Sequence, residues 1–412
     1  MILIECFSES LSENIMESLR LRPDKVYLLG DGSQMRKPLE RCQTILQERG
    51  MKTKIKAVDT RGKDMGTIAG ILADIIRRED ACVIDLSGGD EVTILAVGAL
   101  AASMDSELRS RVYIQRFDPQ LGREVDCDGS GQVLRGRDTV LTVREQIYLY
   151  GGKVHPESYQ PDAKCSPRDL DPLWTIVAEE PREWNKNLSA LNEFEKYSPD
   201  KTDIRLDWDT LPEKIHNNYP GKKARVLALL EKFRQHGVIK NFRSTPNLQY
   251  SYDSPLLRYC TQKAGNVLEV KSLLEARALK DGGAPFFQDC QTGVHIDWDG
   301  VPHKPEERVP ETRNEMDLIL VRGSTPLFIS CKNGNIGEDE LYKLNTVATR
   351  FGGPQARKML IAADLDQKDE TSDQSYIQRA QDMGVYLVTD AAKLTKSEWR
   401  QIFSAAMQMK SF

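Results

Sequence analysis

The chain has 412 residues, of which 40% are hydrophobic and 29% are charged, and its formal net charge is −5. This composition is ordinary for a soluble globular protein and gives no global positive field of the kind that attracts nucleic acids. None of the eight cysteines forms a CxxC pair, which disfavours a zinc cluster and a disulfide framework. The longest uncharged run, Val92 to Met104, is too short to span a bilayer, and the N-terminal segment lacks the basic region of a signal peptide. We therefore expect a cytoplasmic protein with no membrane partner.

Residues 1–150 alternate short apolar runs with segments of helical spacing. This alternation, with central strands that are apolar almost throughout, is typical of a parallel, doubly wound sheet covered on both faces. We expect a Rossmann-like α/β domain with an edge hairpin formed by Arg123–Cys127 and Gln132–Leu134. The expected strands are Ile2–Phe7, Lys25–Leu29, Lys52–Val58, Cys82–Leu86 and Arg111–Phe117, and the expected helices are Leu11–Leu21, Leu39–Arg49, Gly66–Arg78 and Glu91–Met104.

The segment 151–257 has a different character, with frequent proline and an apolar pattern that is helical or irregular. Its stretch Gly221–Arg243 holds seven Lys and Arg residues against one Glu. Two interpretations remain open. The stretch is either a solvated helix with a charged face or part of a winged-helix-like module whose basic face meets phosphates.

Residues 258–412 predict a second α/β unit, because helical and strand patterns alternate again. Its central feature is a hairpin of two apolar strands joined by a short polar turn. The expected strands are Val294–Trp298, Glu315–Val321, Leu327–Lys332, Lys358–Ala362 and Val385–Thr389, and the expected helices are Asn266–Leu279, Leu341–Phe351 and Ser375–Asp382.

A glycine-containing loop, Ser87-Gly88-Gly89-Asp90, follows the fourth expected strand and precedes a helix. Open α/β sheets bind ligands at the carboxyl ends of their parallel strands, and a helix N-terminus offers free N–H groups there. The pattern is neither GxGxxG nor a P-loop, and its acidic residues disfavour direct phosphate contact, so backbone N–H and hydroxyl donors would bind the ligand. Ser8 and Ser10 follow the first strand and are candidates for the same crevice. The alternative is that these side chains only cap helices.

The hairpin at 315–332 carries the strongest chemical signal. Asp317 lies on its first strand, and Ser330, Cys331 and Lys332 end its second. In an extended strand Ser330 and Lys332 point to one face, which the hairpin places beside Asp317. An Asp that ligates a divalent cation and a Lys that positions water suit metal-assisted phosphodiester hydrolysis. An ion pair at the end of a hairpin is the structural alternative.

These residues resemble the PD-(D/E)xK nuclease superfamily, with Ser330-Cys331-Lys332 at the (D/E)-x-K position. Ser330 replaces the second acidic ligand, so another carboxylate is needed. The resemblance implies Glu269 for that role, with Glu315 and Glu340 as weaker candidates. It implies Asp317, Lys332, Glu269 and Ser330 as catalytic residues, and Asp317, Glu269 and the carbonyl of Cys331 as ligands of Mn²⁺ or Mg²⁺.

Over nearly its full length the chain resembles the CARF-domain nucleases of type III CRISPR systems. The segments that carry this resemblance are Asn314-Glu-Met-Asp, Phe-Ile-Ser-Cys-Lys-Asn-Gly, Tyr342-Lys-Leu and Arg350-Phe-Gly-Gly. The loop Ser-Gly-Gly-Asp-Glu departs from the Thr-Gly-Gly-Thr-Lys of many CARF domains.

The resemblance implies a CARF domain at 1–150, a linker at 151–257 that is helical or winged-helix-like, and a restriction-endonuclease-like domain at 258–412. It implies a homodimer that binds a cyclic oligoadenylate, with cyclic tetra-adenylate the favoured activator because its symmetry matches a two-fold site. Activation would lead to cleavage or nicking of DNA, RNA or both, in antiviral CRISPR defence. Two alternatives remain: a nucleotide-responsive transcriptional regulator with a structural hairpin, and a restriction or repair nuclease with an unrelated N-terminal domain.

Overall fold

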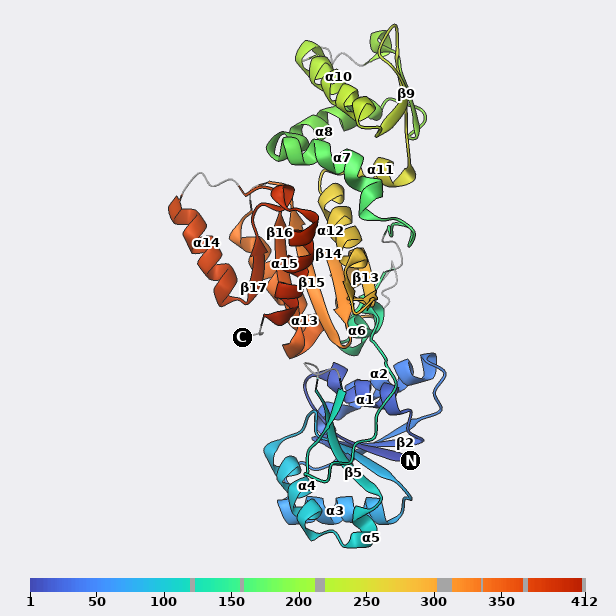
Figure 1. Ribbon diagram of the computed structural model, residues 1–412, viewed down its shortest axis with the longest axis vertical. Coiled ribbons are helices and arrows are strands. Elements are labelled where there is room, and N and C mark those ends of the chain that lie inside the picture. The colour runs from blue at the N-terminus through green and yellow to red at the C-terminus, as the bar shows by residue number, and fades with distance from the viewer. Residues whose placement is uncertain are drawn as a thin grey trace.

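The computed structural model describes residues 1–118, 123–155, 159–211, 219–301, 313–334, 336–365 and 370–409. Three units follow one another along its long axis (Figure 1). The N-terminal sheet lies at one end, a helical unit with a small sheet lies at the other, and the C-terminal sheet lies between them. The first and last parts of the sequence are therefore neighbours in space, and the middle part is remote from the N-terminus.

The N-terminal sheet has the strand order β3-β2-β1-β4-β5-β6, in which only the β5–β6 pairing is antiparallel. Strands β1 and β4 are buried along their whole length, as expected for central strands covered on both faces. The expected Rossmann-like sheet is confirmed. Its strands are β1 (Ile2–Cys6), β2 (Lys25–Gly30), β3 (Lys54–Asp59), β4 (Cys82–Asp85), β5 (Val112–Asp118) and β6 (Arg123–Asp126).

Helices cover this sheet on both sides: α1 and α2 face the C-terminal unit, while α3, α4 and α5 lie on the far side (Figure 1). Helix α2 begins earlier than expected, because the Asp31 side chain accepts a hydrogen bond from the N–H of Ser33 and caps it. The helices are α1 (Leu11–Leu21), α2 (Gly32–Glu48), α3 (Met65–Arg77), α4 (Glu91–Ser103) and α5 (Ser106–Arg109).

The expected hairpin of 123–127 with 132–134 is wrong. Strand β6 pairs with β5, and 132–134 forms no strand. The side chain of Gln115 takes both backbone groups of Leu134, accepting from its N–H at 2.7 Å and donating to its carbonyl at 3.0 Å. Because that side chain satisfies the backbone, residue 134 needs no partner strand.

The unit at the other end has the topology of a winged helix. A three-stranded sheet of order β8-β10-β9 packs with α8 and α10, so the winged-helix interpretation of this region is confirmed at the level of the fold. Its elements are α7 (Pro167–Glu179), α8 (Pro181–Glu195), β8 (Asp203–Leu206), η1 (Trp208–Thr210), α10 (Tyr219–Gln235), β9 (Ile239–Arg243), β10 (Leu248–Tyr252) and α11 (Pro255–Cys260).

The C-terminal sheet has the order β17-β16-β15-β14-β13-β7, with an antiparallel meander from β13 to β15 and parallel strands β15 to β17. The expected hairpin is confirmed as β14 and β15, whereas helix α15 was not expected. The strands are β7 (Lys153–Val154), β13 (Asp289–Asp297), β14 (Arg313–Arg322), β15 (Thr325–Lys332), β16 (Arg357–Ala362) and β17 (Val385–Val388), with a small ribbon of β11 (Lys280–Asp281) and β12 (Ala284–Pro285).

Helices α6 and α13 pack on one face of this sheet, and α12 and α15 pack on the other (Figure 1). The remaining elements are α6 (Val143–Leu149), α12 (Asn266–Ala278), α13 (Glu338–Gly352), η2 (Gly353–Gln355), α14 (Glu370–Asp382), η3 (Ala391–Lys393) and α15 (Lys396–Gln408).

Two continuous cores join the three units. One core combines Ile15 and Ile45 of the N-terminal helices with Ile147 of α6 and with Phe328 and Phe351 of the C-terminal unit. The other combines the winged-helix unit with α12, α15 and the opposite face of the C-terminal sheet. Buried side chains therefore fill both junctions between the units.

Candidate functional site

Asp317 lies where the two strands of the hairpin end side by side. Its carboxylate Oδ2 accepts a hydrogen bond of 2.6 Å from the backbone N–H of Cys331 and one of 3.1 Å from the hydroxyl of Ser330. The hairpin therefore brings Asp317 and Ser330 together, as expected. Ser330 donates to the carboxylate and so helps to orient it.

Lys332, the last residue of β15, forms an ion pair of 2.9 Å with Glu340 at the start of α13. Burial opposes the charged form of this lysine, but the hydrogen bond to Glu340 and the charge of Asp317 raise the pKa of Lys332 above its ordinary value. The lysine therefore stays a cation at neutral pH. Glu340, one of the weaker metal-ligand candidates, is held by this lysine.

Glu269 lies in the first turn of α12, a helix that packs against β14 and β15. Burial and the negative charges of Asp317 and Glu315 raise the pKa of Glu269 to about 8. Burial also raises the pKa of Asp317, although the hydrogen bond from Cys331 and the charge of Lys332 oppose this. Glu315 lies two residues before Asp317 on β14 and so shares its face of the sheet. Two carboxylates of β14 thus act electrostatically on Glu269 of α12.

This donor set fits a hard divalent cation. Among the described residues, no group of three or more His, Cys, Asp or Glu side chains is placed to hold a metal ion. Asp317 and Glu269 both carry buried carboxylates, and the negative charge of Asp317 disfavours ionisation of Glu269. Mg²⁺ takes one or two carboxylates and keeps several waters, so these two carboxylates suffice for it.

The winged-helix unit positions the segment that follows Lys332. The side chain of Asn185 on α8 donates to the carbonyl of Asn333, and the side chain of Asn333 donates to the carbonyl of Ala264. Trp184 on α8 donates to the same Ala264 carbonyl at 3.1 Å. The roles of Trp184, Asn185 and Asn333 were not expected. The sequence offers one signal for them, the Asn-Gly pair that follows the Ser-Cys-Lys segment.

At the other candidate site, the loop after β4 packs directly on the loop after β1. A Cβ atom at Gly88 would lie 2.5 Å from the Cβ of Ser8 and 2.7 Å from the carbonyl oxygen of Cys6. Gly89 has a φ of +113°, a conformation that other residues rarely adopt. Glycine at these two positions therefore allows the loops at the ends of β1 and β4 to touch.

The polar side chains of this loop are held by local contacts. The hydroxyl of Ser87 donates to Asp85 at 2.7 Å, and burial raises the pKa of Asp85 to about 7. Asp90 accepts a hydrogen bond from the N–H of Thr93 at 2.8 Å and caps α4. This agrees with the alternative interpretation, in which the side chain caps a helix. Ser10 occupies the cap position of α1 without a side-chain cap bond, although its N–H donates to Ser8.

Comparison with solved structures finds two chains of the same architecture. The protein VC1899 from Vibrio cholerae superimposes with a TM-score of 0.69 at 19% identity, covering 99% of this chain and 97% of that one. Can2 from Sulfobacillus thermosulfidooxidans, in complex with cyclic tetra-adenylate, superimposes with a TM-score of 0.61 at 15% identity, covering 98% and 97%. The chain therefore has the same fold as these two proteins. Neither protein-family models nor the curated proteins give a match.

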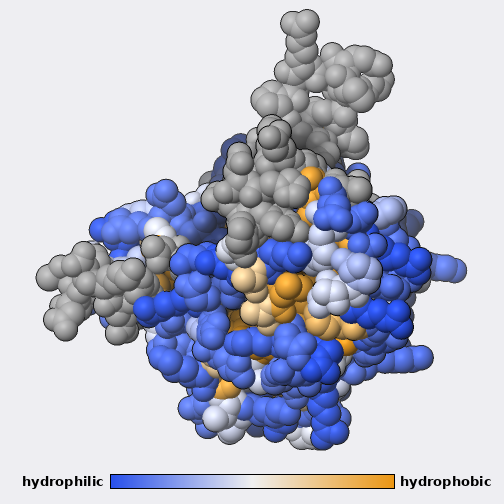
Figure 2. All heavy atoms as spheres, turned by 90° about the horizontal axis from the view of Figure 1, so that it is seen from above, coloured by the Kyte–Doolittle hydropathy of each residue, from blue (hydrophilic) through white to orange (hydrophobic). Residues whose placement is uncertain are grey.

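The likeness covers all three units of the chain: the N-terminal parallel sheet, the winged-helix unit and the C-terminal mixed sheet. In the described residues, no helix is both long and apolar enough to cross a membrane. The winged-helix end of the molecule is mostly hydrophilic, and hydrophobic residues gather there in a small area (Figure 2).

Ion pairs engage much of the basic stretch 221–243. Four of its seven cationic side chains pair with carboxylates: Lys222 with Glu193, Lys232 with Glu179 and Glu180, Arg234 with Glu231, and Lys240 with Asp253. Each pair lowers the positive potential that the unit presents to phosphates. The solvated, charged-face interpretation therefore describes most of these side chains, on a winged-helix framework.

Proposed function

We propose that the chain is a metal-dependent endonuclease that cyclic tetra-adenylate activates in antiviral CRISPR defence. The nuclease half is supported by Asp317, which lies beside the end of β15 that carries Lys332, and by Glu269 of α12, on which both charges act. Two buried carboxylates that repel each other, beside a permanently charged lysine, are costly unless a cation and an anionic substrate complete the charges. A phosphodiester with a divalent cation supplies both.

Each side chain has a separate task in this proposal. Asp317 and Glu269, with the carbonyl of Cys331, hold Mg²⁺ or Mn²⁺, which when bound lowers the pKa of a water and polarises the phosphate. Lys332 orients the attacking water and stabilises negative charge as an ammonium, since it does not lose its proton at neutral pH. Ser330 orients Asp317, and Glu340 holds the lysine.

The activator half rests on the contact between the loops after β1 and β4 and on the likeness to a fold that holds cyclic tetra-adenylate in Can2. We infer that Ser8, Ser10, Ser87, Gly88, Gly89 and Asp90 line this site and offer hydroxyl and backbone N–H donors. The Asp90 side chain contributes by fixing the start of α4.

A homodimer is part of the proposal. Apolar side chains at the starts of α3 and α4 are exposed beside the loop: Met65 at 44%, Val92 at 42%, Ile94 at 41% and Leu95 at 61%. Exposed apolar groups next to a ligand loop mark an interaction surface. A second copy of the chain is the favoured occupant, because it would place two equivalent loops around one symmetric ring.

Helix α1 connects the two halves. It begins directly after Ser8 and Ser10, and its Glu13 accepts a hydrogen bond from Gln355, which follows α13 of the nuclease unit. Its buried side chains Leu11 and Ile15 belong to the core that reaches β14 and β15. A shift of α1 on ligand binding would therefore change the packing beneath the candidate nuclease centre.

The test is cleavage of single- and double-stranded DNA and RNA with Mg²⁺ or Mn²⁺, with and without cyclic tetra-adenylate. Cutting that requires both the cation and the activator supports the proposal and ranks the substrates. Cleavage at the same rate with and without cyclic tetra-adenylate would support a nuclease, but its N-terminal domain would then have another role.

A transcriptional regulator is the second candidate, because the winged-helix topology occurs in DNA-binding proteins. The ion pairs along the basic stretch weaken this candidate. Sequence-specific DNA binding without cleavage, under every cation and activator condition, would favour it over the nuclease.

A further inference from the structure

A cavity of about 480 Å³ lies in the winged-helix unit, beside β10 and α11. Tyr159 and Tyr259 line one part of it, and Tyr252, Asp253 and Arg258 line another. Its volume is that of a small-molecule site and is large enough for one nucleobase with its sugar. Neither the metal-binding residues nor the candidate activator site uses it.

Two stacked tyrosines form an aromatic wall of this cavity. The ring centroids of Tyr159 and Tyr259 are 3.7 Å apart, and their planes differ by 21°. Both side chains are partly exposed, so the stack is accessible from the cavity. A flat aromatic surface of this kind is the feature on which proteins stack unpaired bases.

The tyrosine stack is adjacent to the candidate nuclease centre. The carbonyl of Tyr259 accepts a hydrogen bond of 2.9 Å from the side chain of Asn266, the first residue of α12, whose first turn carries Glu269. Burial and the negative charge of Glu269 raise the pKa of the Tyr259 phenol. A base held on this stack would therefore belong to a nucleotide close to the scissile phosphate.

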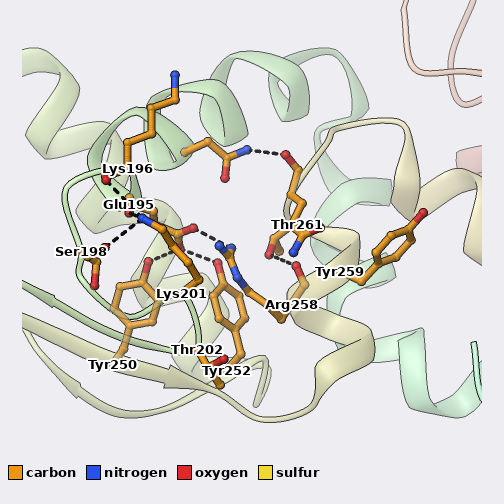
Figure 3. Close-up of polar contacts among 12 residues, drawn as sticks. Glu195, Lys196, Ser198, Lys201, Thr202, Tyr250, Tyr252, Arg258, Tyr259 and Thr261 are labelled. Carbon is orange, nitrogen blue, oxygen red and sulfur yellow. Dashed lines mark hydrogen bonds and ion pairs between the residues drawn. The ribbon is translucent and has the colours of Figure 1, made fainter. Parts of the chain in front are cut away.

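The opposite wall is fixed by a buried network (Figure 3). Glu195 accepts hydrogen bonds from the hydroxyl of Tyr252 at 2.6 Å and from the guanidinium of Arg258 at 2.6 Å, as well as from Tyr250. Tyr259 points away from this network, on the other side of Arg258 (Figure 3). Walls that are held in place before binding lower the entropic cost of ordering a ligand.

The two charged side chains of the cavity wall already have partners. Arg258 pairs with Glu195 at 2.6 Å and Asp253 pairs with Lys240 at 3.7 Å, so neither adds an uncompensated charge. Gln262 and Thr202 offer neutral polar groups that suit a base edge.

We propose that this cavity is a nucleobase subsite of the nuclease centre and that it takes an unpaired base of a single-stranded substrate. This inference rests on the proposed nuclease function. A paired base is stacked inside its duplex and does not reach the tyrosine faces, so the subsite makes the enzyme prefer single strands.

The first experiment compares wild type with Tyr159→Ala, using the full chain with cation and cyclic tetra-adenylate. The substrates are single-stranded oligonucleotides that carry an abasic site at each position in turn. In the wild type, one abasic position should raise KM by about 5- to 150-fold, the effect of losing one stacked base. Tyr159→Ala should raise KM on the intact strand by a similar factor. The KM of this variant should not change further when that position is abasic.

This coupling separates a binding role from a structural one, because a merely destabilised protein would lose activity equally on both substrates. Tyr197→Ala removes an exposed tyrosine outside the cavity and serves as the control. Additive effects of Tyr159→Ala and the abasic position, or cleavage of a duplex as readily as a single strand, would overturn the proposal.

A second measurement does not depend on cleavage. Oligonucleotides that contain 2-aminopurine are titrated into the Lys332→Ala full chain with the activator, and stacking quenches their fluorescence. Quenching that Tyr159→Ala abolishes supports the base site even if the protein cuts nothing, in which case only the nuclease proposal fails. Cleavage by the wild type without any quenching would contradict the base-site proposal and would still support the nuclease proposal. If the protein shows no quenching and no cleavage, both proposals are wrong.

Discussion

The carboxylate of Asp317 accepts a hydrogen bond of 2.6 Å from the backbone N–H of Cys331, across the end of the β14–β15 hairpin. This bond fixes the carboxylate at the strand end from which the Lys332 side chain projects. The geometry leads to the first prediction. Lys332→Ala and Asp317→Ala should each lower cleavage by about 10²- to 10⁴-fold, as expected for loss of a group that acts on the reacting water or its cation.

Binding of cyclic tetra-adenylate, measured by calorimetry, should be unchanged in both variants because the activator loop is in another unit. Lys343→Ala, an exposed lysine on α13, is the matched control and should cut normally. Full activity in Lys332→Ala would refute the site assignment.

The second prediction concerns pH and Glu269. Because the folded-state pKa is raised from 4.5 to about 8, the folded chain keeps a proton that the unfolded chain releases. Its contribution to stability is therefore fully present below about pH 4.5 and is lost as the pH rises through about 8. Without a cation, Glu269→Gln should unfold at a higher temperature than wild type at pH 9 and should cut no substrate.

A divalent cation should reverse this order, since it binds the ionised carboxylates. Mg²⁺ or Mn²⁺ should raise the Tm of wild type more at pH 9 than at pH 6 and should leave Glu269→Gln unaffected. An equal cation effect in both proteins would show that Glu269 is not a ligand.

The third prediction tests the activator loop. Gly88→Glu should block activation, because a Cβ at this position meets Ser8 and the backbone of Cys6, and the added charge repels a phosphate ligand. Gly221→Glu adds the same charge at a position where a Cβ meets no atom within 4 Å, and it should behave as wild type. Unchanged affinity for cyclic tetra-adenylate in Gly88→Glu would exclude this loop as the site.

The fourth prediction concerns the joint between the N-terminal helices and α6. Arg49 holds both oxygens of Glu145, at 2.6 Å and 2.7 Å. Arg49→Ala should bind the activator normally but lose activation by a factor on the order of ten, because a bidentate pair that couples the two units is removed. Arg36→Ala, on the same helix but with its side chain 85% exposed, should activate fully. The ratio of activated to basal cleavage decides between these outcomes.

The fifth prediction tests the dimer surface. Leu95→Asp should give a monomer in analytical ultracentrifugation and should bind cyclic tetra-adenylate more weakly, since half of the proposed site comes from the second copy. Val301→Asp changes another exposed apolar residue and should leave the assembly intact. A dimer that survives Leu95→Asp would place the interface elsewhere.

Much of the fold followed from local patterns. Strand β1 was predictable because a strand that is buried on both faces is apolar along nearly its whole length. Helix α1 was predictable because its apolar residues recur at helical spacing. The hairpin of β14 and β15 was predictable for the same reason, because one short turn joins its strands and sets the pairing of Asp317 with Ser330. The edge hairpin failed because a single side chain, Gln115, replaced a strand as the partner of Leu134.

The amino-acid sequence alone determined the order of strands and helices and the chemistry of the Asp317 and Lys332 hairpin, because backbone periodicity and a local turn encode them. Only the tertiary structure decided which distant charges meet. It brought Glu269 beside Asp317, gave Glu340 to Lys332 and stacked Tyr159 on Tyr259. It also neutralised much of the basic stretch with carboxylates from other elements. Contacts between residues far apart in the chain depend on how whole elements pack, and no local pattern records that packing.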